Sequence, residues 1–179
     1  MTTDTTLTPT ANECSQPRRF SDFGTFGEAL DYAANGARGL CFHDARGNLE
    51  RPYPFRELRE DALAMAARLV AAGAKPGDRV ALVAETGPDF AALFCGAVYA
   101  GAWPVPLPLP TSFGGKDNYI DQLAIQLSSC DPMMLLYPEE IAEMAGQAAR
   151  RQGCEGITFE DFGARAAPEA DLPQVKPDD

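Results

Sequence analysis

The stretch FAALFCGAVYAGAWPVPLPLPTSFGG, residues 90–115, determines how the rest of the chain can fold. It has no charged residue over 26 positions, in a chain with 26 acidic and 15 basic side chains. Its second half carries a proline at every other position. Because proline lacks a backbone N–H and forces its predecessor out of the helical region, no helix extends through it. We predict a buried helix at 90–100, a stop at Gly101, a short buried strand at 102–105 and a stiff exit loop.

The same stretch is apolar enough to be mistaken for a membrane span. However, the helix left by the prolines is shorter than the roughly 20 residues that cross a bilayer, so we expect no span. Residues 1–10 are rich in threonine and lack the apolar core of a secretory signal. Five scattered cysteines without a CxxC pair fit reduced thiols. These features together predict a cytoplasmic protein.

The alternating prolines restrict how the exit loop can pair with other strands. In an extended chain, successive N–H groups point to opposite sides, so the four prolines all lose donors on one side. Past Val105 the segment can therefore pair with one neighbour at most, and it must leave the sheet or run along its edge. The prolines are Pro104, Pro106, Pro108 and Pro110.

Three apolar residues between these prolines share one face, and we call them the apolar rail: Val105, Leu107 and Leu109. They lie about 7 Å from neighbour to neighbour. The loop at 111–115 is polar except for Phe113. Because open α/β sheets bind ligands beyond the carboxyl ends of their strands, the rail and Phe113 are our candidate substrate-contacting residues. The alternative, which the residues leave open, is a core strand followed by a rigid crossover.

Length and charge limit the class of protein. A chain of 179 residues with 45% hydrophobic and 23% charged residues has the composition of one ordinary globular domain. The net charge of −11 argues against nucleic acid as a partner, because the phosphates would be repelled.

The remaining elements follow from apolar spacing and turn residues. Thr25 and Glu28 form a capping box before a short helix that ends near Gly36. Thr86 is predicted to cap the buried helix. The other predicted helices are 54–72, 119–128, 138–151 and 160–167, and the predicted strands are 39–43, 49–53, 79–84, 133–137 and 156–159.

Alternation of strand and helix after residue 78 predicts a parallel sheet with right-handed crossovers. The expected fold class is therefore α/β, a mostly parallel sheet flanked by helices and preceded by a helix and a β-hairpin. We expect a disordered leader at 1–20, one α/β subdomain at 21–167, and a linker or truncated end, exposed to solvent, at 168–179.

Motifs for chemistry are missing from the sequence. It has no GxGxxG, no GxxxxGK[ST] and no GxSxG motif. His43 is the one histidine, and the cysteines are too scattered to form a zinc site with it. We therefore predict no catalytic, cofactor-binding or metal-ligating residue in this chain.

Four segments resemble a known superfamily. YPFREL (53–58), KPGDRVAL (75–82) and YAGAWPVPL (99–107) are similar to motifs of adenylate-forming enzymes. PLPLPTSFGG (106–115) resembles the fatty acyl-AMP ligases more than the acyl-CoA synthetases. The resemblance covers about residues 20–179.

The resemblance implies a ligase of fatty acid metabolism and lipid biosynthesis. Such an enzyme joins a fatty acid to ATP with Mg²⁺, releases pyrophosphate, and passes the acyl group to the phosphopantetheine thiol of an acyl carrier protein that feeds a polyketide or lipopeptide synthase. It also implies that the rail and Phe113 help to wall the acyl tunnel.

In the family, the phosphate loop, the nucleotide contacts, the magnesium-side glutamate and the catalytic lysine all lie downstream of this region. The resemblance therefore implies a fragment, the first subdomain, that binds neither ATP nor Mg²⁺ alone and is inactive without the remainder of the ligase. The competing reading is a non-catalytic α/β module that binds a partner protein or an acyl chain.

Overall fold

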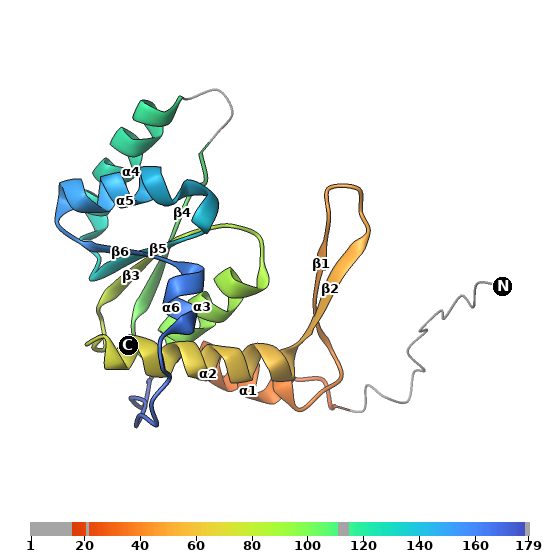
Figure 1. Cartoon of the computed structure of the whole chain (residues 1–179). Coiled ribbons are helices and arrows are strands. Elements are labelled where there is room, and N and C mark those ends of the chain that lie inside the picture. Colours follow the sequence, from red (N-terminus) through yellow and green to blue (C-terminus); the bar gives the residue numbers. More distant parts are fainter. Residues whose placement is uncertain (1–15, 21, 111–114, 178–179) are drawn as a thin grey trace.

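The computed structural model describes residues 16–20, 22–110 and 115–177 (Figure 1). Most of the predicted leader, and Phe113, therefore lie outside the described residues. The helices are α1 (Phe26–Ala34), α2 (Phe55–Ala71), α3 (Pro88–Tyr99), α4 (Lys116–Cys130), α5 (Ala142–Gln152) and α6 (Phe159–Ala164), with a 3₁₀ helix η1 (Glu139–Ile141) before α5. The strands are β1 (Gly39–His43), β2 (Leu49–Pro54), β3 (Arg79–Val83), β4 (Trp103–Leu107), β5 (Met134–Tyr137) and β6 (Glu155–Thr158).

The main sheet of the described chain has four parallel strands in the order β4-β3-β5-β6. Helices α4 and α5 cover one face, and α2, α3 and α6 cover the other (Figure 1). Strands β1 and β2 form a separate antiparallel hairpin, which projects away from the sheet (Figure 1). The predicted fold class, including the preceding helix and hairpin, is confirmed.

The central strand β3 is apolar and buried from Val80 to Val83 because both of its faces are covered. Ala81 and Val83 pack toward α4 and α5, whereas Val80 and Leu82 pack toward α2 and α3. Successive side chains of a strand point to opposite faces, so a short apolar run fills two cores at once.

Strand β4 lies at one edge of the sheet, which is one of the two outcomes that the prolines allowed. Trp103 donates its N–H to the Asp78 carbonyl at 2.7 Å, and the Leu107 carbonyl accepts from Ala84 N–H at 2.8 Å. Because bonding positions alternate along a strand, Pro104 and Pro106 face the open side. The prolines there remove no bond to β3, and the strand consequently runs to Leu107, two residues beyond the predicted end.

Helix starts were predicted with mixed success. The Thr25 hydroxyl accepts from Glu28 N–H at 3.1 Å, as expected of a cap, and Glu28 in turn accepts from Gly24 N–H at 2.8 Å. The cap at Thr86 was wrong, because α3 begins after Gly87 with Pro88 in its first turn. The helix predicted from Pro138 starts as η1 and becomes α-helical at Ala142.

Helices α2 and α3 pack closely because Gly96 has no side chain. A β-carbon at Gly96 would lie 2.7 Å from Met65 Cβ and 2.9 Å from the Ala62 carbonyl oxygen. Both distances are shorter than van der Waals contact, so any larger residue at this position would push the helices apart.

Part of the predicted linker lies against the domain. Leu172 packs against the core beside α2 and α3. A β-carbon at Gly24 would lie 3.3 Å from Pro177 Cγ. The expected solvent exposure of this segment therefore fits Pro168 but does not hold at Leu172, which contacts the core.

Candidate functional site

The carboxyl ends of the parallel strands meet at one edge of the main sheet. From β3 the chain turns through α3 on one face to β4, and from β4 it returns through α4 on the other face to β5. The connections therefore change direction between β3 and β5. Ligands of open α/β sheets bind at such a point. The candidate site thus centres on the exits of β3 and β5, with the exit of β4 beside them.

The structure separates the three residues of the apolar rail. Val105 and Leu107 pack in the core between β4 and α4, where Leu107 is 6% exposed. Leu109 is 38% exposed. Within this chain Leu107 is a core residue, Val105 packs partly buried against the core, and Leu109 is the rail residue that remains most open to a ligand.

Tyr119 on α4 holds the exit of β4, a contact that sequence reasoning missed. Its hydroxyl donates to the Pro108 carbonyl at 3.1 Å, and burial raises the pKa of Tyr119 to about 12. The sequence showed Tyr119 only as one apolar position of a helix. A phenol on the buried face of the helix that follows a proline loop was the available signal, because a buried hydroxyl needs a partner.

The edge beside β3 is acidic. Glu85 follows β3, and its pKa is raised, first by partial burial and then by the negative charges of Glu140 and Asp89. Like charges in a partly buried position disfavour a further anion. Among the described residues no group of three or more acidic, histidine or cysteine side chains could hold a metal ion.

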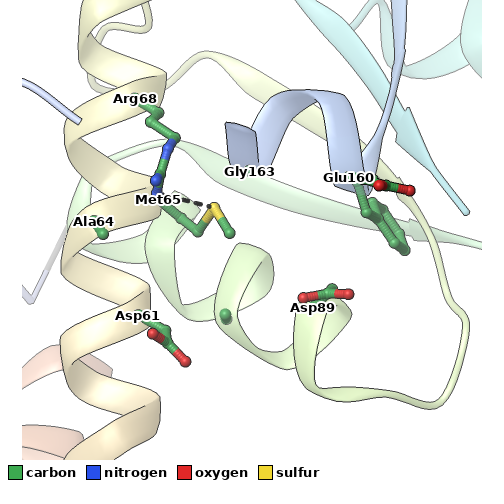
Figure 2. A pocket seen from close by; sticks show the side chains of 9 residues that line it. Asp61, Ala64, Met65, Arg68, Asp89, Glu160 and Gly163 are labelled. Atoms are coloured by element: carbon green, nitrogen blue, oxygen red, sulfur yellow. Dashed lines mark hydrogen bonds between the residues drawn. The ribbon is translucent and has the colours of Figure 1, made fainter. Parts of the chain in front are cut away.

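A pocket of about 470 Å³ lies between α2, α3 and α6, on the face of the sheet that these helices cover (Figure 2). Two of its polar side chains, Asp61 and Arg68, bond to other parts of the fold. Asp61 accepts from the Tyr53 hydroxyl at 2.6 Å, and Arg68 binds the Arg165 carbonyl. The lining residues are Asp61, Ala64, Met65, Arg68, Asp89, Ala92, Phe159, Glu160 and Gly163. They include no rail residue and no nucleophile paired with a base.

Three of the described thiols are weak nucleophiles. Burial raises the pKa of Cys95 to about 11. It also raises the pKa of Cys130 and of Cys154. Because the thiolate is the reactive form, these three cysteines are poor nucleophiles at neutral pH.

Two of the segments that carry the family resemblance meet at the amino edge of the sheet, far along the strands from the candidate site. Gly77 donates its N–H to the Gly101 carbonyl at 2.8 Å, which ties the turn before β3 to the turn before β4. Gly101 has a φ of 72°, and a β-carbon there would lie 3.3 Å from the Pro76 side chain. Gly77 and Gly101 therefore have a structural role.

The tyrosines of the resembling segments are also structural. Tyr53 is buried, and its pKa is raised by that burial and by its bond to Asp61. The Tyr99 hydroxyl donates to Asp31 at 2.7 Å, and Arg59 contacts the same carboxylate at 2.6 Å. Both tyrosines fasten the hairpin and α1 to the layer of α2 and α3.

In the described residues no helix is long and apolar enough to pass through a membrane, in agreement with the sequence analysis.

Comparison with known proteins gives a consistent set of matches. A family model described as AMP-binding enzyme matches residues 35–178. A provisionally named acyl-CoA synthetase of Caulobacter vibrioides is 38% identical over 178 residues, which cover 97% of this chain and 30% of that protein. The long-chain-fatty-acid–AMP ligase FadD32 of Mycolicibacterium smegmatis is 34% identical over 106 residues, 59% of this chain and 16% of the ligase. The chain therefore spans less than a third of the length of either relative.

Solved structures match over most of the chain. One from studies of fatty acyl-adenylate ligases of E. coli and L. pneumophila superposes with a TM-score of 0.85 at 34% identity, covering 90% of this chain and 29% of that one. The N-terminal subdomain of Klebsiella oxytoca NpsA, solved with 3-hydroxyanthranilyl-AMSN, superposes with a TM-score of 0.62 at 18% identity, covering 85% of this chain and 34% of that one. The second match shows the shared fold alone.

Proposed function

The chain belongs to the family of AMP-binding enzymes, and from this we propose that it is part of a fatty acid–AMP ligase. The observation that carries the proposal is the match, at 34% identity, to a structure from work on fatty acyl-adenylate ligases. The fold is that of the N-terminal subdomain of an adenylate-forming enzyme.

In the proposed reaction, a carboxylate oxygen of the fatty acid attacks the α-phosphorus of ATP. The bond from that phosphorus to the bridging oxygen breaks, so acyl-adenylate forms and pyrophosphate leaves. A phosphopantetheine thiol of an acyl carrier protein then attacks the acyl carbon, a thioester forms, AMP leaves and the thiol proton passes to solvent. Each step is balanced without an oxidant or a reductant.

We assign the binding of ATP and Mg²⁺ to parts of the ligase outside this chain. The acidic edge around Glu85 supports this assignment for ATP, because its negative charges disfavour phosphate. The remainder of the ligase and the carrier protein are the proposed partners, and the cytoplasm is the proposed location.

The proposed contribution of this chain is structural support and one wall for the acyl chain. Leu107 fills the core beneath the exit of β4, and Leu109 follows it at the surface. An apolar side chain there offers area to a fatty acid without a polar group that would need a partner.

An exchange assay between ATP and labelled pyrophosphate tests the proposal. We expect no exchange from these 179 residues, and exchange that depends on a fatty acid from the product of the gene read beyond codon 179. Exchange by the short chain would contradict its proposed inactivity. A stop codon after Asp179, or a longer product that shows no exchange with any fatty acid, would favour the non-catalytic module instead.

A further inference from the structure

The exit of β4 contains little that can hold it in place. Of the three residues 108–110, Pro108 and Pro110 have no backbone N–H, so only Leu109 can donate. The ladder to β3 ends where Ala84 donates to the Leu107 carbonyl. Beyond that bond, within the described residues, the structure gives the exit one hydrogen bond, from Tyr119 to Pro108 at 3.1 Å.

Tyr119 is itself fixed and can therefore serve as an anchor. It is 6% exposed and packs with Ile120 and Leu123 in the core between β4 and α4. Only the end of its ring reaches the exit. Pro108 is exposed, so water can hydrogen-bond to its carbonyl when the Tyr119 hydroxyl is removed. The hydrogen bond from Tyr119 therefore fixes the position of Pro108 more than it contributes to the stability of the fold.

We propose that Tyr119 is a positioning residue which, through Leu109, determines the lengths of fatty acid that the ligase accepts. The inference rests on the proposed function. Leu109 follows the tethered Pro108 carbonyl directly and is the first rail residue outside the core. The tether therefore fixes where the apolar surface available to an acyl chain begins. One methylene in an apolar pocket changes selectivity about tenfold or more, so a small displacement of Leu109 is measurable.

The test uses the full-length ligase with Tyr119→Phe and measures kcat/KM for a series of saturated fatty acids. We expect the ratio between the best and the neighbouring chain lengths to change about tenfold. The change should lie in KM for the fatty acid, with KM for ATP unchanged.

The matched control is Tyr53→Phe. Tyr53 is also buried and its hydroxyl also makes one hydrogen bond, to Asp61 on α2 at 2.6 Å, but it lies where the hairpin packs on α2 and not at the exit of β4. A loss of core stability alone would lower activity equally for all chain lengths in both variants. Leu109→Ala is expected to shift the same preference as Tyr119→Phe, and the double variant to shift it no further. If Tyr119→Phe does not fold, Leu109→Ala decides, because an unchanged preference there overturns the inference.

The two levels of the proposal can fail separately. If the unmodified ligase shows no exchange that depends on a fatty acid, the proposed function is wrong. If it is active and Tyr119→Phe leaves the preference unchanged, or lowers all chain lengths alike, only the role of Tyr119 is wrong.

Discussion

The strands of the main sheet begin at one edge, the amino edge, and end at the other, the carboxyl edge, and these two edges are held in place differently. At the amino edge, backbone bonds tie the turns together: Gly77 to Gly101 at 2.8 Å and Trp103 to Asp78 at 2.7 Å. At the carboxyl edge, the exit of β4 is held by one side chain, Tyr119, and Glu85 experiences the charges of its acidic neighbours. Two of the segments that carry the family resemblance therefore lie at the amino edge, where backbone hydrogen bonds hold the turns. At the carboxyl edge, which is proposed to meet the substrate, the exit of β4 is held by one side chain.

This difference explains why family membership was easier to recognise than function. A turn fixed by backbone bonds and by a glycine at positive φ accepts few residues, so its sequence is distinctive. The exit of β4 is also distinctive in sequence because of its prolines, but a segment held by one side-chain hydrogen bond does not show through its bonds what it contacts. Four changes test the contrast, beginning with the largest expected effect.

Leu107→Ala should cost about 2–5 kcal/mol of unfolding free energy, because a nearly buried leucine leaves a cavity between β4 and α4. Leu109→Ala is the matched control and should cost less than about 1 kcal/mol, since its side chain is 38% exposed. Urea denaturation of both variants measures the difference. Equal costs would mean that the rail does not divide between core and surface as described.

Gly101→Ala should cost about 2 kcal/mol, because an alanine at a φ of 72° is strained and its β-carbon would press on Pro76. Gly115→Ala meets similar strain at a φ of 68° but has open space around it, so we expect about 1 kcal/mol. Thermal unfolding followed by circular dichroism compares them. A larger loss at Gly115 would reverse the proposed order of rigidity between the two edges.

Replacing both Pro104 and Pro106 with threonine should change stability by less than about 1 kcal/mol, because neither proline faces β3. The replacement restores two N–H donors on the open side of β4. Exposed strand edges with intact donors recruit other chains. We expect greater self-association in sedimentation velocity at high concentration, and an unchanged monomer would show that the prolines do not protect this edge.

Glu85→Gln should have the smallest effect, and it depends on pH. The pKa of Glu85 in the folded chain is raised above its ordinary value of 4.5, so its ionisation lowers stability as pH rises through the folded pKa. Replacing Glu85 with glutamine removes this loss of stability, because glutamine does not ionise. The variant should be slightly more stable than the parent at pH 7, and the two should converge below pH 4.5, where the carboxyl is protonated in both states. A parent that is more stable at pH 7 would contradict the assigned cause.

Local patterns predicted more of the fold than of the site. The order of helices and strands followed from apolar spacing. The prolines left open whether the segment past Val105 leaves the sheet or runs along its edge, so the predicted strand ended two residues before Leu107. The sequence left open whether the rail residues pack in the core or form a wall for a ligand. Which of these holds depends on where α4 packs against β4. Phe113 lies outside the described residues, so its role stays a prediction.

The sequence alone determined the α/β class, the parallel strands and the resemblance to adenylate-forming enzymes, because these depend on residues close together in the chain. Only the tertiary structure decided the strand order β4-β3-β5-β6, the burial of Leu107, the anchoring of Pro108 by Tyr119 and the packing of Leu172 on the core. Several of these features join segments distant in sequence; β3 at 79–83, for example, pairs with β5 at 134–137. Such contacts are fixed by how the faces of helices and sheet pack together, and no local pattern records that packing.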